Sequence, residues 1–61
     1  MLNKVKERLE SSRIMYVESA VPHGVKLTLP NGVFVTVYNK GTVLVQGNPT
    51  NAIKVKQLLG L

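Results

Sequence analysis

Two short glycine-containing turns separate three runs of alternating side chains, and this arrangement most constrains the fold. The runs are "VKLTL" at 25–29, "VFVTVY" at 33–38 and "TVLVQ" at 42–46, joined by "PNG" and "NKG". β-Branched and aromatic residues that alternate with polar ones are typical of strands, and short loops closed by glycine are typical of hairpins. The sequence therefore predicts an antiparallel meander through residues 25–46.

The length of the two loops determines how these strands pair. If each loop holds three residues, with the closing glycine in the left-handed conformation, Leu27 lies opposite Val35 and Thr36 lies opposite Leu44. A two-residue "NG" loop would shift the first strand by one residue and place Leu27 beside Phe34. We prefer the three-residue loops because they separate the side chains cleanly into two faces.

The two predicted sheet faces differ in composition. One is aliphatic and consists of Val25, Leu27, Leu29, Val33, Val35, Val37, Val43 and Val45. The other mixes basic, hydroxyl, aromatic, aliphatic and amide side chains, namely Lys26, Thr28, Phe34, Thr36, Tyr38, Thr42, Leu44 and Gln46. The aliphatic face stabilises the fold only when another layer removes it from water.

Helical patterns lie on both sides of the meander. Residues 2–11 are predicted to form a helix because their apolar residues recur at helical spacing. These apolar residues are Leu2, Val5 and Leu9. The motif "GNPT" at 47–50 is typical of a helix start, in which either Asn48 or Thr50 is the cap. The inward stripe of this second helix consists of Ala52, Val55 and Leu59, and Gly60 ends it.

A fourth strand is predicted at 13–19, "RIMYVES", followed by a turn at "AVPHG". We expect Glu18 to face water, and alternation then places Tyr16 and Ile14 on the same side. Tyr16 and Ile14 would thereby join the mixed face. The residues expected on the opposite side are Met15 and Val17.

The predicted fold class is α+β: a helix, a four-stranded antiparallel meander sheet and a second helix, with both helices on the aliphatic face. The 61 residues suffice for a single small domain over 1–61, and a composition of 44 percent hydrophobic and 18 percent charged residues is that of a globular protein. The chain has no Cys, which excludes disulfides, and its single His argues against a structural zinc site.

Acidic residues are scarce in this chain. Lys and Arg number 8, acids number 3, none of them Asp, and the net charge is +5. Such a balance favours a polyanionic partner such as nucleic acid, although small domains also need net charge for solubility.

No apolar stretch approaches the ~20 residues that span a bilayer, and the N-terminal residues do not resemble a signal peptide, so we expect a cytoplasmic protein.

The residues needed for catalysis are not grouped in this sequence. His23 lies in a predicted turn without a nearby carboxylate, which is typical of a solvated turn residue. The glutamates are scattered over the first 18 residues, and the glycines show no phosphate-loop spacing. We therefore expect no enzymatic activity, no metal and no cofactor.

The uncovered mixed face is the candidate functional surface. Aromatic rings on a flat sheet can stack on bases or sugars, lysines can reach phosphates, and hydroxyl and amide groups can form hydrogen bonds. The predicted nucleic-acid-binding residues are Lys26, Thr28, Phe34, Thr36, Tyr38, Lys40 and Gln46.

The same face also supports a different interpretation. A contiguous apolar patch usually marks an interface, without saying whether a protein or a nucleic acid binds there. The alternative is therefore a protein-interaction module, such as a small phage or mobile-element regulator or inhibitor, that binds a protein partner. A chain this small, without disulfide or metal, also has reason to associate with itself, and we predict a homodimer.

The segment "GVFVTVYNKGTVLVQGNPTNA", 32–52, resembles the substrate-binding N-terminal domain of ribonuclease HIII. The shared features are a strand, a Tyr, a short Gly turn, a strand that ends in Gln-Gly, and then a helix. That domain is similar to one half of the TATA-box-binding protein fold. The resemblance implies binding of nucleic acid, whether DNA, RNA or their hybrid, through the curved sheet, and this chain would do so as a stand-alone module without the family's catalytic domain. Tyr38, Lys40 and Gln46 occupy the matching positions, whereas Thr42 stands where the family usually has a second basic residue.

Overall fold

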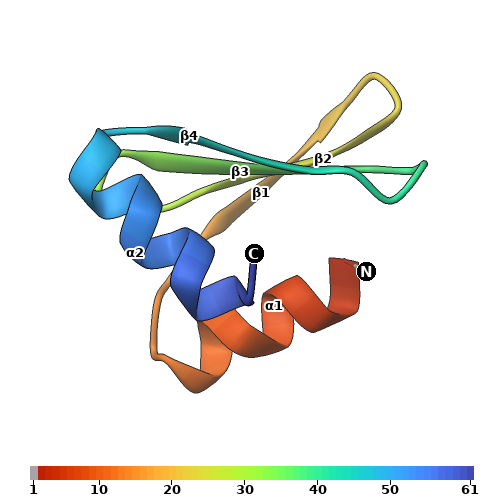
Figure 1. The fold of residues 1–61 in the computed structure, drawn as a ribbon. Coiled ribbons are helices and arrows are strands. Elements are labelled where there is room, and N and C mark those ends of the chain that lie inside the picture. The colour runs from red at the N-terminus through yellow and green to blue at the C-terminus, as the bar shows by residue number, and fades with distance from the viewer. Residues whose placement is uncertain (1) are drawn as a thin grey trace.

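A sheet and a pair of helices form two layers in the computed structural model, which describes residues 2–61 (Figure 1). The elements are α1 (Leu2–Ser11), β1 (Val17–Val21), β2 (Gly24–Thr28), β3 (Val33–Tyr38), β4 (Val43–Gly47) and α2 (Pro49–Leu59). The four strands are antiparallel neighbours in the order β1-β2-β3-β4. Both helices lie on the same side of the sheet. The predicted α+β class and order of elements are confirmed.

Three-residue loops set the register of the β2–β3 and β3–β4 hairpins, as predicted. Leu27 pairs with Val35, and Thr36 pairs with Leu44. The closing glycines are left-handed, with φ of 78° at Gly32 and 97° at Gly41. A residue with a Cβ atom adopts this conformation only at a cost, so these two positions favour the short turns that fix the pairing.

The predicted aliphatic face is the core. Leu9, Leu27, Val33 and Val35 are fully buried. The other buried hydrophobic residues are Val5, Leu29, Val37, Val45, Ala52 and Val55, with Val25 and Val43 packed against them. Both helices therefore supply the stripes that the sequence predicts, and the sheet contributes the aliphatic side of β2, β3 and β4.

Helix α2 has well-defined ends. The side-chain oxygen of Asn48 accepts hydrogen bonds from the amides of Thr50 at 3.0 Å and Asn51 at 3.3 Å, so Asn48 is the cap. At the other end Gly60 adopts a φ of 76°, and its amide donates to the Gln57 carbonyl at 3.1 Å. Both ends satisfy backbone groups that the helix itself leaves unpaired.

The predicted orientation of the first strand is wrong. Glu18 pairs with Leu27 in the register of β1 and β2, so both side chains point toward the helices. Tyr16 and Ile14 are likewise packed against the core and do not belong to the uncovered face. The residues that alternate with them, and that are exposed, are Met15 and Val17.

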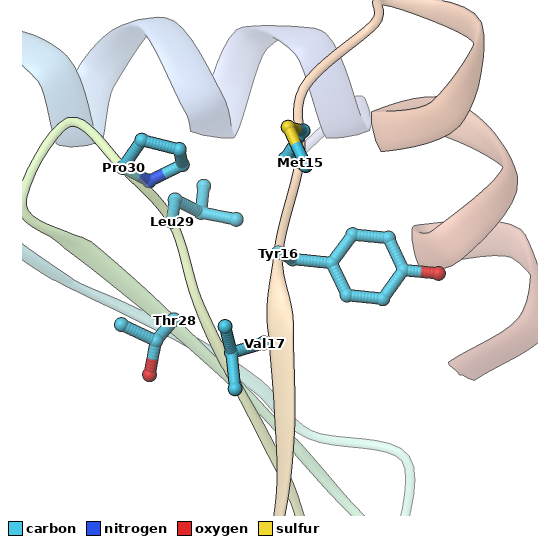
Figure 2. A pocket seen from close by; sticks show the side chains of 6 residues that line it. All are labelled: Met15, Tyr16, Val17, Thr28, Leu29 and Pro30. Carbon is cyan, nitrogen blue, oxygen red and sulfur yellow. The ribbon is translucent and has the colours of Figure 1, made fainter.

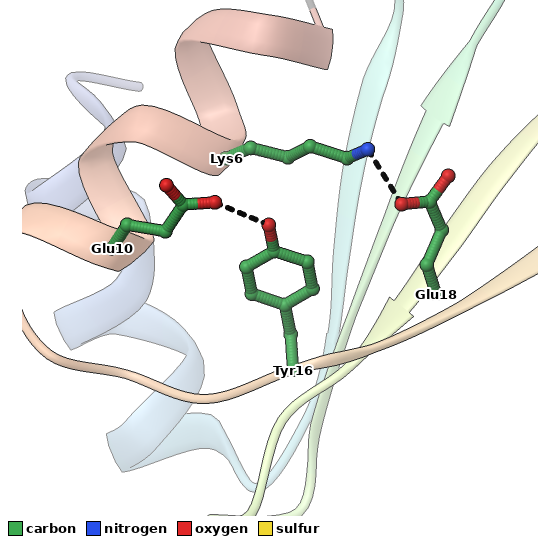
Figure 3. A network of polar contacts seen from close by, with 4 residues as sticks. All are labelled: Lys6, Glu10, Tyr16 and Glu18. Carbon is green, nitrogen blue, oxygen red and sulfur yellow. Dashed lines mark hydrogen bonds and ion pairs between the residues drawn. The ribbon is translucent and has the colours of Figure 1, made fainter.

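Helix α1 is the reason for this reversal, because it supplies polar partners beneath β1 (Figure 3). The Lys6 ammonium nitrogen lies 2.5 Å from a Glu18 carboxylate oxygen. The Tyr16 hydroxyl donates a 2.6 Å hydrogen bond to the Glu10 carboxylate. A carboxylate can therefore face the helix layer, and the assumption that Glu18 must mark the water-facing side fails.

The hydrogen bond to Glu10 also affects the titration of Tyr16. This bond, followed by partial desolvation and by the negative charges of Glu10 and Glu18, raises the pKa of Tyr16 above its usual value. The phenol is protonated at neutral pH even at its ordinary pKa, and the raised pKa lets it donate to Glu10 up to a higher pH. The contact anchors the segment before β1 to α1.

The bounds of β1 also differ from the prediction. The strand runs from Val17 to Val21, rather than over 13–19, and the turn contains only Pro22 and His23. His23 has a φ of 65°, in the left-handed region. The two-residue turn brings β1 and β2 together over five pairs, which gives the sheet its fourth strand.

Candidate nucleic-acid interface

The side of the sheet away from the helices, called here the open face, is built from three rows of residues across the strands. The first row is Val17, Thr28, Phe34 and Gln46. The second is Ser19, Lys26, Thr36 and Leu44, and the third is Val21, Gly24 and Tyr38. Met15 precedes β1 on the same side. The register therefore brings together every predicted site residue except Lys40, which lies in the turn between β3 and β4.

A lysine lies over an aromatic ring at the centre of the open face. The Lys26 ammonium nitrogen is 4.5 Å from the centroid of the Phe34 ring, within the range of a cation–π contact. Thr36, the cross-strand neighbour of Lys26 in the second row, is only 7% exposed. Phe34 is thus partly covered in the free protein, and Tyr38 is the aromatic side chain that lies beyond this pair.

The carboxylates lie on the other side of the molecule. Glu7 and Glu10 belong to α1, and Glu18 forms an ion pair with Lys6 on the helix side of the sheet. The open face carries Lys26, with Lys40 and His23 at one end, and none of its rows contains an acid. An anion approaching this face therefore meets no carboxylate directly.

Positive charge is also present on the helix layer. Its exposed basic residues are Lys4, Arg8, Lys54 and Lys56. The guanidinium of Arg8 lies 3.5 Å from the carbonyl oxygen of Leu58, between the two helices. The open face is therefore distinguished by its lack of acid and its aromatic rings rather than by a concentration of basic residues.

A hollow of about 450 Å³ lies at the end of the open face where the β1–β2 and β3–β4 turns meet. It is lined by His23, Tyr38, Asn39 and Lys40. The backbone amide of Asn39 donates a 2.8 Å hydrogen bond to the carbonyl of His23, which ties the two turns together. The sequence predicts His23 only as a solvated turn residue, without Tyr38, Asn39 and Lys40 beside it. The strand register was the available signal, because it places the turns after β1 and β3 at the same end of the sheet.

An apolar cleft of about 290 Å³ lies at the opposite end of β1 and β2 (Figure 2). It is lined by Met15, Tyr16, Val17, Thr28, Leu29 and Pro30. Met15 is 78% exposed and Val17 is 66% exposed. This surface was not predicted, because the orientation expected for β1 placed Met15 and Val17 on the side covered by the helices.

Some classes of site are not found within residues 2–61. No group of three or more His, Cys, Asp or Glu side chains is arranged there to hold a metal ion. Neither described helix is long and apolar enough to cross a membrane. Comparisons with protein-family models, with curated proteins and with solved structures found no match to this chain.

Proposed function

We propose that this protein is a small nucleic-acid-binding module that uses its open face. The observation that supports the proposal most is the separation of side chains by the sheet. Lys26, Phe34 and Tyr38 lie on one side, and all carboxylates lie on the other. Aromatic rings and basic groups on a sheet without acids suit a stacked, negatively charged ligand.

Each predicted site residue has a role in this proposal. Tyr38 stacks on a base or packs against a sugar, while Lys26 and Lys40 contact phosphates. The remaining polar groups, Thr28, Thr36 and Gln46, form hydrogen bonds to sugars or base edges. The resemblance of residues 32–52 to the ribonuclease HIII substrate-binding domain supports the same surface, because Tyr38 and Gln46 occupy its matching positions.

Replacing Tyr38 with alanine should weaken nucleic-acid binding by about 1–3 kcal/mol if its ring stacks on a base. Replacing Lys40 with glutamine should reduce the salt slope of binding by about one unit, because one phosphate contact is lost. Fluorescence anisotropy with single-stranded, duplex and hybrid oligonucleotides at two salt concentrations measures both effects. Lys54→Gln is the matched control, since Lys54 is exposed on α2 and its loss removes the same charge.

Two results would contradict the proposal. One is that wild-type protein binds none of the three nucleic-acid forms. The other is that Tyr38→Ala and Lys40→Gln bind as tightly as Lys54→Gln, which would place the nucleic acid on the helix layer.

A second candidate function is self-association through the apolar end of the open face. Met15 and Val17 are exposed beside an apolar cleft, and β1 is an edge strand of the sheet. Exposed apolar side chains next to an unpaired strand favour contact with another chain. A second copy of this chain offers the same cleft and edge, as a two-fold interface requires.

Sedimentation equilibrium above micromolar concentration should therefore show a dimer. The double variant Met15→Ser, Val17→Thr should shift the distribution to monomer, because it removes the apolar contact while Thr retains the β-branch that suits a strand. Ile53→Ser is the control, since Ile53 is exposed on α2. A wild-type protein that stays monomeric would argue against this candidate.

A further inference from the structure

We infer that the hollow lined by His23, Tyr38, Asn39 and Lys40 binds a phosphate monoester, namely the terminal phosphate of a nucleic-acid strand. This inference rests on the proposed function, because it adds an end-binding site to the open face. It concerns a residue, His23, that the open-face rows do not include.

Most of the exposed lining of the hollow is apolar, and each of its four residues also carries one group that can donate a hydrogen bond. Lys40 supplies an ammonium group, Asn39 an amide, Tyr38 a phenol, and His23 an imidazole N–H. None of the four lining residues carries a carboxylate that would repel an anion. Such a set matches a ligand made almost entirely of acceptors, and phosphate is the common biological group of that kind.

The chemistry of the donors favours a monoester over an internal diester. A phosphate monoester carries about −1.5 to −2 charges at neutral pH and has three terminal oxygens. An internal phosphodiester carries a single charge and has two free oxygens, which one lysine and one further donor already satisfy. Donors from four residues in one hollow therefore suit a monoester better.

The backbone prepares this hollow before any ligand arrives. The Asn39 amide donates a 2.8 Å hydrogen bond to the His23 carbonyl, and this bond holds the two turns next to each other. Gly24 allows this close approach, because a Cβ atom there would lie 3.0 Å from the Cα of Tyr38 and still closer to the Val37 carbonyl oxygen. A site held in place by its backbone loses little entropy when the ligand binds.

The position of the hollow connects it with the open face. Tyr38 belongs both to the third row of the open face and to the hollow lining. Beyond Tyr38 the sheet ends in the two turns, at the end away from α2 and from the turn between β2 and β3 (Figure 1). A strand lying along β3 would reach the hollow with its terminus, and about 450 Å³ leaves room for the attached sugar.

The test compares oligonucleotides of one sequence that end in a 5′-phosphate, a 3′-phosphate or hydroxyls only. The protein should bind one phosphorylated form about tenfold more tightly than the hydroxyl form, as expected for one or two added charge-assisted hydrogen bonds. His23→Asn should remove this preference. Asparagine suits the variant because it tolerates the φ of 65° at this position. Lys54→Gln, on the helix layer, should keep the preference.

Two-dimensional amide NMR spectra locate the site and distinguish the sources of phosphate. Titration with adenosine monophosphate or inorganic phosphate should shift the amide signals of Gly24, Asn39, Lys40 and Gly41. The spectrum of His23→Asn shows whether the variant is folded, and Lys40→Gln serves as a second variant with an unchanged His23 turn. A folded protein gives dispersed signals, so loss of binding is separated from loss of structure.

The outcomes separate this inference from the proposed function. Equal binding of phosphorylated and hydroxyl ends would overturn the inference and leave the open face as the binding surface. Binding of adenosine monophosphate at the hollow without binding of any oligonucleotide would support a phosphate site and overturn the proposed function. A preference that His23→Asn and Lys40→Gln both retain would place the phosphate elsewhere and overturn the inference.

Discussion

A Val35→Asp variant should be unfolded at 25 °C. Val35 is fully buried at the middle of β3 and pairs with Leu27 on one side and Val45 on the other. An unpaired carboxylate in this position would cost several kcal/mol, while a domain of this size has a total stability of about 5 kcal/mol. Circular dichroism and the dispersion of amide NMR signals measure the loss of structure.

The matched control for Val35→Asp is Ser19→Asp. Ser19 is exposed on β1 and points to the open face, so the same charge enters a strand without being buried. This control should remain folded. A Val35→Asp protein that unfolds cooperatively on heating would show that the helix-covered face is not the core.

Replacing Gly47 with alanine should destabilise the protein by at least about 2–3 kcal/mol. Gly47 has a φ of 125°, and an added Cβ atom would lie 3.0 Å from the Cα of Val33 and still closer to the Gly32 carbonyl oxygen. These neighbours are backbone atoms at the turn between β2 and β3, so they cannot move without disturbing the register of that hairpin. The midpoint of urea denaturation measures the change.

Gly41→Ala separates the two causes of that effect. Gly41 also has a positive φ, of 97°, but an added Cβ atom there meets no atom within 4 Å. The loss of stability in Gly41→Ala should be limited to the conformational cost of a positive φ, about 1 kcal/mol. Equal losses of stability in Gly41→Ala and Gly47→Ala would mean that the close approach of β4 to the turn before β3 does not add to the destabilisation at Gly47.

The meander could be predicted because its information is local. The glycines at 32 and 41 close three-residue loops, and such loops permit one pairing that buries only aliphatic residues. The caps of α2 are local as well, since Asn48 and Gly60 bond to amides and carbonyls within four residues. These features depend on contacts between near neighbours in sequence, and the structure confirms them.

The candidate site could be predicted only in part. Lys26, Phe34, Tyr38 and Gln46 follow from strand alternation and lie on the open face as expected. Alternation cannot show that the Lys26 ammonium lies over the Phe34 ring, because that depends on side-chain rotamers across two strands. It also cannot show that His23 and Lys40 line one hollow, since two turns 17 residues apart meet only when the sheet is complete.

The sequence by itself determined the β2–β3 and β3–β4 hairpins, the helices and the aliphatic core of this protein, because alternation, turn glycines and helix caps act within a few residues. Only the tertiary structure decided which side of β1 faces the helices. Glu18 suggested the opposite orientation, since a lone carboxylate on a strand normally faces water. The Lys6 ammonium and the Glu10 carboxylate of α1 make the helix side acceptable for Glu18 and Tyr16. That reversal leaves Met15 and Val17 exposed and removes the carboxylate of Glu18 from the open face.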